Sequence, residues 1–228
     1  MRDSTRRNRL PRVVQIGFHK CGTRTFQRLF ERAGHKVVQH KLRAPLRRNR
    51  NAAFLMRENL KAGRKVFSGM ENYVFYAGLI YQTETESFEA IRSFREIIRD
   101  YPDTILLLNK RNREDWVRSR LKHGHGEFAK RVMRQRGIES VEELAETWRQ
   151  DWDTHIAEVR EFMADRPEQL VEFDLDTGSV EALVERFSDY GLTADYWGDI
   201  GRTRGIKHHP LVAKAKKTWA HLRWRADT

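Results

Sequence analysis

Alternating apolar and polar stretches along the chain predict strands and helices that follow one another. Short apolar runs rich in β-branched residues predict buried strands at 13–18, 35–39, 65–68, 104–109 and 170–173. Apolar residues at three- and four-residue spacing, or capping signals, predict helices at 51–61, 87–100, 114–122, 140–164, 179–190 and 211–225, and from Arg24 onward. This order predicts an α/β fold with three layers, in which helices flank a mostly parallel central sheet.

The first strand, loop and helix carry the strongest chemical signal. A tight loop at 19–23 contains Lys20 and Gly22, and the helix that starts at Arg24 has Gly34 where a C-terminal cap belongs. The unpaired amides and the dipole of a helix N-terminus favour an anion such as phosphate. Lys20 adds a full positive charge at the same place.

This loop departs from a magnesium-nucleotide loop in two ways. Gly17 and Gly22 have the spacing of the motif G-x-x-x-x-G-K-[ST], but Thr23 stands where that motif has lysine. The strand at 104–109 ends in Asn109, whereas a Walker B strand ends in an aspartate that holds Mg²⁺. Both departures weaken a magnesium-nucleotide interpretation, although Asp174 after the strand at 170–173 is a second candidate for that aspartate.

A second phosphate-binding pair follows the strand at 104–109. Arg111 lies at the strand end, and Ser119 comes eight positions later, in the next helix. A guanidinium at the carboxyl edge of a parallel sheet can bind a phosphate in bidentate fashion. Ser119 is expected near the same face.

The segments 19–25 and 107–119 together resemble the two signatures of the sulfotransferases that use 3′-phosphoadenosine 5′-phosphosulfate (PAPS). The carbohydrate or glycoconjugate type, with its P-loop NTPase-like fold, is the nearest in pattern. The resemblance spans roughly residues 13–200 and is specific only at these two motifs. Arg113 stands where many members have proline. The resemblance implies that PAPS is the co-substrate, that adenosine 3′,5′-bisphosphate is the product and that no metal is required.

The same resemblance assigns roles to individual residues. The 5′-phosphosulfate group would contact Lys20, Cys21, Gly22, Thr23, Arg24 and Thr25, and the 3′-phosphate would contact Arg111 and Ser119. A late basic loop would add Arg204, Gly205 and Lys207. Cys21 is expected to act through its backbone amide as a small loop residue.

Sulfuryl transfer to a hydroxyl needs a base and a cation at the leaving oxygen. Lys20 is expected to stabilise the leaving phosphate oxygen. Glu71 is the candidate base, because it follows the predicted strand at 65–68 and because carbohydrate sulfotransferases use a glutamate after the corresponding strand. His19, His123 and His125 are the alternatives for this role.

The net charge of +12 is concentrated at the chain ends. Residues 1–12 carry +4 and residues 206–228 carry +5, which leaves +3 for residues 13–205. We therefore expect a basic N-terminal tail at 1–12, a sulfotransferase domain at 13–205 and a basic tail or helix at 206–228. The tails suit an anionic membrane surface, and no pattern of a specific nucleic-acid-binding module is present.

Cysteine content and apolar run length bear on where the protein works. A single cysteine fits a reducing compartment, and the longest apolar run, 74–81, is far below the roughly 18 residues of a membrane span. We therefore expect a cytoplasmic protein that can lie on the inner face of a membrane. The acceptor is expected to be a carbohydrate or glycoconjugate, since a glutamate is the candidate base and the basic loop at 41–50 suits an anionic acceptor.

Two other functions remain open at this point. One is an ATP- or GTP-dependent P-loop kinase, which would need Mg²⁺ and would prefer a nucleoside triphosphate. The other is a non-catalytic nucleotide-binding module recruited through its basic ends. The presence of both Lys20 and Arg111 argues against the second.

Overall fold

Five parallel strands form the central sheet of the protein. The structure, a computed structural model, describes residues 10–42 and 51–198. The strand order is β2-β3-β1-β6-β7, and all four pairings are parallel. The strands are β1 (Val13–Gln15), β2 (Val37–Gln39), β3 (Phe75–Ala77), β6 (Ile105–Lys110) and β7 (Leu170–Asp174).

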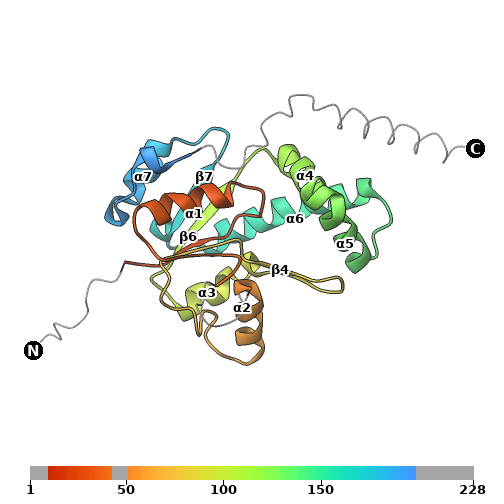
Figure 1. The fold of residues 1–228 in the computed structure, drawn as a ribbon, viewed down its shortest axis with the longest axis horizontal. Helices are drawn as coiled ribbons and strands as arrows, with labels where there is room; N and C mark the ends of the chain where they lie inside the picture. Colours follow the sequence, from red (N-terminus) through yellow and green to blue (C-terminus); the bar gives the residue numbers. More distant parts are fainter. Residues whose placement is uncertain (1–9, 43–50, 199–228) are drawn as a thin grey trace, which may run out of the picture. The chain divides into compact units, whose positions relative to one another are not determined.

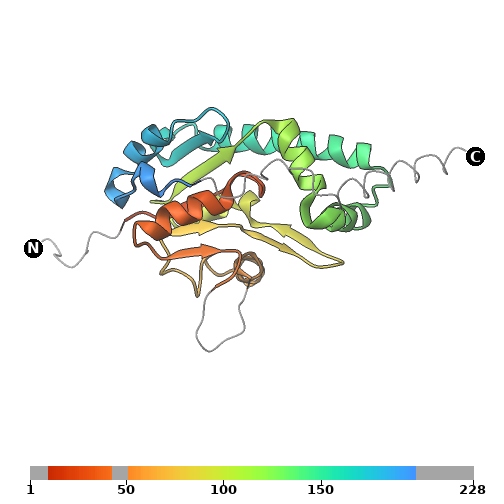
Figure 2. The same cartoon turned by 45° about the horizontal axis from the view of Figure 1, so that its top comes forward.

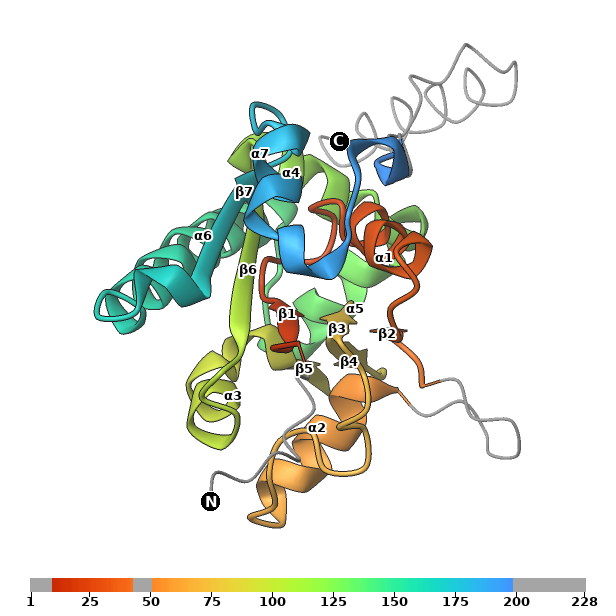
Figure 3. The same ribbon diagram turned by 90° about the vertical axis from the view of Figure 1, so that its left-hand side faces the viewer.

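Helices cover both faces of this sheet and complete three layers (Figure 1). One face packs against α1 (Thr23–Arg32) and α7 (Val180–Arg186). The other face packs against α2 (Ala52–Lys61), α3 (Phe94–Asp100), α4 (Arg113–Leu121), α5 (Glu127–Arg136) and α6 (Val141–Phe162). Figure 3 shows α1 and α6 on opposite sides of β1 and β6. The predicted α/β fold is confirmed.

The strands of the sheet centre have apolar side chains on both faces. In β6, Leu107 packs in the core beneath α1, while Leu106 and Leu108 pack in the core on the side of α6. Val13 and Val14 of β1 divide in the same way. Parallel strands buried on both faces have continuous apolar runs such as 104–109. These runs made the strands recognisable in the sequence.

An antiparallel hairpin is a separate addition to the sheet. It consists of β4 (Ile80–Gln82) and β5 (Ser87–Glu89), and Figure 2 shows it extending toward α5. Glu84 at its tip lies 2.9 Å from Arg131 and 2.6 Å from Arg134 of α5. This hairpin, the sheet strand β3 and helix α5 were not predicted from the sequence.

Two predicted elements differ from the structure. The segment 65–68 forms turns instead of a strand: the Ser68 amide donates to the Lys65 carbonyl, and Asn59 of α2 donates to the carbonyls of Val66 and Ser68. In the segment 87–100 the α-helix begins only at Phe94, because residues 87–89 form β5 and residues 90–92 form a short 3-10 helix. In both cases buried apolar residues matched the expected pattern, but the backbone adopts another conformation.

The remaining predicted elements occur with small shifts of their ends. Ser140 accepts a hydrogen bond from the Glu143 amide at the start of α6, as the capping signal predicted. Gly34 follows α1 with a φ of 86°, and the His35 amide donates to the Phe30 carbonyl, which is the Schellman pattern. The predicted helix at 211–225 lies outside the described residues.

Candidate functional site

The loop between β1 and α1 is held from behind by side chains that bind its carbonyl groups. Trp116 Nε1 donates to the His19 carbonyl at 3.1 Å, and Arg111 Nη1 lies 3.5 Å from the Lys20 carbonyl. Asn109 Nδ2 donates to the Cys21 carbonyl. The donors come from the end of β6 and from α4, so one wall of the site is built by a single strand–helix unit.

These contacts fix the direction of the loop amides. In a trans peptide the carbonyl of one residue and the N–H of the next point in opposite directions. The amides of Lys20, Cys21 and Gly22 therefore point away from the donors. The first amides of α1 add unpaired N–H groups. Lys20 and Gly22 have positive φ values of 76° and 72°, which helps successive amides converge on an anion.

Three cationic side chains share this region. Partial burial and then the charges of Arg24 and Arg111 lower the pKa of Lys20. Arg24 is exposed at the start of α1, and Arg111 is half-buried at the end of β6. Their mutual repulsion would be relieved by a bound anion, so this part of the site suits a phosphate or a similar anion.

Two glycines are required by close approach. A Cβ at Gly17 would lie 1.9 Å from the Asn109 carbonyl oxygen. A Cβ at Gly22 would lie 2.6 Å from Leu175 Cδ2, and its positive φ also favours glycine. These two positions therefore keep the loop against β6 and against the residue that follows β7.

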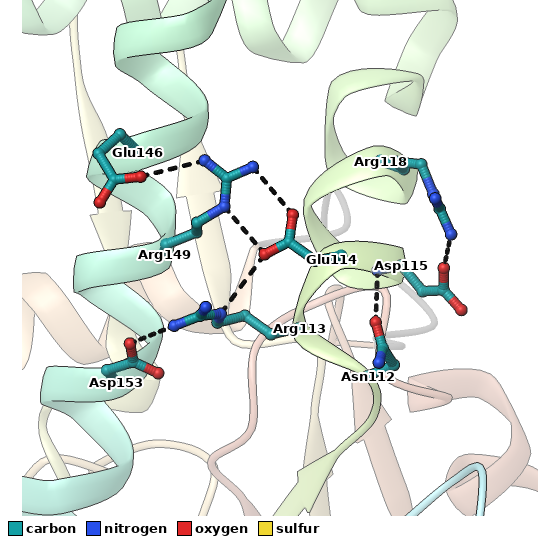
Figure 4. Close-up of polar contacts among 8 residues, drawn as sticks. All are labelled: Asn112, Arg113, Glu114, Asp115, Arg118, Glu146, Arg149 and Asp153. Atoms are coloured by element: carbon teal, nitrogen blue, oxygen red, sulfur yellow. Dashed lines mark hydrogen bonds and ion pairs between the residues drawn. The ribbon is translucent and has the colours of Figure 1, made fainter.

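Helix α4 is fixed in place by a polar network with α6, which positions the residues at its start (Figure 4). Arg149 of α6 binds Glu114 through Nε and Nη2, at 2.9 and 2.8 Å. Arg113 contacts Asp153 of α6 as well as Glu114. It occupies the first helical position, where proline is common, so its departure from the family pattern keeps the turn and adds a link to α6. Ser119 lies on α4 with a partly exposed side chain.

A narrow cleft adjoins the loop. Gly17, His19 and Thr23 line one side of it. The other side contains residues 78–80, which follow β3, and Glu89 of β5. The cleft thus lies at the carboxyl edge of β1 and β3, where ligands bind in sheets of this type.

Glu89 is a site residue that the sequence analysis missed. Burial alone would raise its pKa, but the charges of Arg120 and Arg92 outweigh this effect and lower the pKa. Arg120 of α4 is almost fully buried and donates to Glu89 Oε1. Local pattern gave no signal for Glu89, because the pair joins residues 31 positions apart.

Aromatic rings surround the Arg120 guanidinium. Its Cζ lies 4.6 to 5.5 Å from the ring centroids of Phe18, Trp116, Phe128 and Trp148. Such rings stabilise a desolvated cation. They also hold the guanidinium in one place, so Arg120 orients Glu89 toward the cleft.

The three candidate histidines differ in burial and in their surroundings. The His19 ring packs on Phe128, and its Nε2 is buried without a partner among the described residues. Burial and then the charge of Arg120 lower the His19 pKa well below its usual value, so the ring is neutral. His123 has its ring 5.6 Å from that of His19, and burial and the charge of Lys20 lower its pKa. His125 is exposed in the turn before α5.

The structure does not bring Glu71 to this site. Its backbone carbonyl accepts from Arg12, which directly precedes β1, and its carboxylate accepts from the Gly69 amide. Glu71 therefore lies at the edge where β1 and β3 begin, whereas the loop lies at the edge where β1 ends. The expectation that it follows a strand beside Lys20 is wrong, because 65–68 is not a strand.

Other predicted residues divide into three groups. Cys21 is buried, and burial raises its pKa, in keeping with a backbone role rather than a nucleophilic thiolate. Trp116 and Trp148, on α4 and α6, are fully buried core residues. Arg204, Gly205 and Lys207 lie outside the described residues.

The described residues contain neither a candidate metal site nor a candidate membrane-spanning helix. Across 10–42 and 51–198, no group of three or more His, Cys, Asp or Glu side chains could hold a metal ion. None of the helices in this part of the chain is long and apolar enough to cross a membrane.

Comparison with known proteins identifies the family. No curated protein matches the chain significantly. A family model described as a sulfotransferase domain matches residues 12–135, which include the loop after β1, Glu89, Asn109, Arg111 and Ser119. This match covers more than half of the 228 residues, and the chain therefore belongs to the sulfotransferase domain family.

Proposed function

We propose that the protein transfers a sulfuryl group from PAPS to a hydroxyl of a carbohydrate or glycoconjugate. The observation that carries this proposal is the loop after β1, whose amides converge beside Lys20, Arg24 and Arg111. When bound, PAPS supplies the sulfuryl group, and adenosine 3′,5′-bisphosphate is the leaving group. The loop amides would hold the 5′ end, and Arg111 with Ser119 would hold the 3′-phosphate.

Lys20 and Glu89 divide the chemistry of the transfer in this proposal. An S–O bond to the acceptor oxygen forms, the S–O bond to the 5′-phosphate breaks, and the acceptor proton passes to a base. Glu89 takes the base role instead of Glu71, because it is the carboxylate that lines the cleft beside the loop. Lys20 stabilises the charge that develops on the leaving oxygen.

A carbohydrate acceptor is supported by the carboxylate of Glu89, which lines the cleft beside the loop. It is also supported by Lys41, the first residue of the basic segment 41–50, which follows β2 at the same edge of the sheet. Of that segment, only Lys41 and Leu42 lie within the described residues.

Transfer of ³⁵S-labelled sulfate from PAPS to a panel of glycans and phenols tests the activity. The proposal predicts labelled glycans in the presence of a metal chelator. Labelling of phenols alone would contradict the acceptor class. Label transfer only from ATP, and only with Mg²⁺, would favour the kinase alternative.

Matched variants test the base. Glu89→Gln keeps an acceptor for Arg120 but cannot take a proton, so turnover should fall by roughly 10²–10⁴-fold while nucleotide binding persists. His19→Asn is the comparison, and a larger loss there than in Glu89→Gln would transfer the role to His19. Glu71→Gln should leave turnover close to normal.

The predicted cellular context is a separate proposal. We place the protein in the cytoplasm, with its basic ends able to bind an anionic membrane surface. Sedimentation with vesicles containing 30% phosphatidylserine tests this, and charge reversal of Arg2, Arg6 and Arg7 should weaken binding. Equal binding to neutral vesicles would contradict an electrostatic origin.

A further inference from the structure

Asn109 joins the two ends of the phosphate-binding loop. It is the penultimate residue of β6 and is only 1% exposed. Its Oδ1 accepts from the Gly17 amide at 3.1 Å, and its Nδ2 donates to the Cys21 carbonyl. One side-chain amide therefore bridges the residue that enters the loop and a residue near its end.

The chemistry of this bridge requires an amide side chain. It needs one acceptor and one donor at the same position, and asparagine offers both on a short stem. Aspartate could still accept from Gly17, but its second oxygen would face the Cys21 carbonyl. An apolar residue of similar size would leave both loop groups buried without partners, which is unfavourable.

The backbone of Gly17 also packs directly against Asn109. Because a Cβ at Gly17 would lie 1.9 Å from the Asn109 carbonyl oxygen, the two backbones touch directly. The Ile16 carbonyl just before Gly17 lies 2.8 Å from Nε2 of the buried His155 of α6. The entry to the loop is thus fixed on both sides before any ligand binds.

The bridge has a consequence for anion binding. Since the Cys21 carbonyl is turned toward Asn109, the Gly22 amide points the opposite way, into the region of Lys20. A loop held in this shape loses less conformational entropy when it binds its ligand.

We propose that Asn109 is a positioning residue that holds the loop in its anion-binding shape and thereby strengthens binding of the donor's 5′ end. The identity of the ligand rests on the proposed function, but the action of Asn109 on the loop does not.

Calorimetry with two nucleotides separates this role from a general loss of structure. Adenosine 3′,5′-bisphosphate engages both ends of the site, whereas adenosine 3′-monophosphate lacks the group that the loop binds. Asn109→Ala and Asn109→Asp should weaken bisphosphate binding by about 10- to 100-fold. The affinity for the 3′-monophosphate should change by less than about twofold, with or without Mg²⁺.

Asn59→Ala is the matched control. Asn59 is equally buried and donates to two backbone carbonyls, at 3.1 and 2.9 Å, but it lies on α2, outside the site. This variant should lose a similar amount of stability and keep both affinities. Unchanged bisphosphate binding in Asn109→Ala would overturn the proposal, as would an equal loss for both nucleotides.

A parallel measurement keeps the test independent of the donor. Inorganic pyrophosphate should raise the melting temperature of the wild-type protein and of Asn59→Ala, but much less that of Asn109→Ala. If the wild-type protein binds pyrophosphate and not the bisphosphate, the proposed donor is wrong and the loop role stands. Equal stabilisation of all three proteins would refute the role of Asn109.

Discussion

Replacing Arg120 by methionine should destabilise the protein strongly, because it leaves the Glu89 carboxylate buried without its main partner. The two side chains are 2% and 10% exposed. At an effective dielectric constant of about 20, unit charges about 3 Å apart attract by about 5 kcal/mol. Removing one member of a buried ion pair typically costs about 3–5 kcal/mol. Methionine fills much of the aromatic cage, so we expect a loss in this range at pH 7.

The pH dependence of this loss identifies its cause. Without Arg120, burial should raise the pKa of Glu89 above that of the unfolded chain. The destabilisation is then full above this raised pKa and shrinks as the pH falls and Glu89 takes up a proton. Urea unfolding at pH 7 and pH 5 measures both values, with the fluorescence of the buried Trp116, Trp148 and Trp152 as the probe.

Two controls make the reasoning open to refutation. Arg118→Met removes an exposed arginine one turn from Asp115 and should cost less than about 1 kcal/mol. The double variant Glu89→Met with Arg120→Met should be more stable than Arg120→Met alone, because no buried charge remains. A loss below about 1 kcal/mol in Arg120→Met, or the same loss at both pH values, would refute the account.

Three further predictions address the donor site and the sheet edge. Lys20→Met should lower the rate of sulfuryl transfer by about 10²–10³-fold, with a smaller effect on bisphosphate affinity; an equal fall in both would mean that Lys20 acts only in binding. Arg111→Met should weaken adenosine 3′,5′-bisphosphate binding by about 10- to 100-fold and leave adenosine 5′-monophosphate binding nearly unchanged in calorimetry; equal losses would contradict a 3′-phosphate contact. Arg160 and then Lys110 lower the Glu172 pKa to about 2, so Glu172→Gln should cost less than about 1 kcal/mol at pH 7 in urea unfolding, and this cost should shrink as the pH falls from the unfolded-state pKa toward about 2; a constant loss would exclude the ion pairs as its origin.

Four of the five strands of the central sheet, and the positions of the two proposed phosphate-binding motifs, follow from local pattern, whereas β3 does not. Strands such as β6 are buried on both faces, so their apolar runs are continuous and end where polar site residues begin. The loop after β1 carries its chemistry in consecutive residues. Lys20 and Arg111 could therefore be predicted to lie at the same edge of the sheet, because neighbouring parallel strands have their carboxyl ends at one edge.

The proposed base, Glu89, could not be found in this way, because its position depends on long-range contacts. Glu89 reaches the cleft through an antiparallel hairpin and a pair with Arg120, neither of which leaves a local pattern. Glu71 was misplaced because Val66 and Phe67 are buried by packing in a turn, and a short apolar run does not distinguish this from a strand. The contacts of Asn109 with the loop could not be predicted either, because the sequence showed only that Asn109 stands where a Walker B strand has aspartate.

The most direct test of the account is calorimetry of the wild-type protein with adenosine 3′,5′-bisphosphate and with ATP, each in a chelator and in Mg²⁺. Loop amides, Lys20 and Arg111 should bind the bisphosphate in the chelator, and Mg²⁺ should not strengthen this binding. ATP should bind more weakly in both conditions. Tight binding of ATP that requires Mg²⁺, together with weak binding of the bisphosphate, would contradict the account.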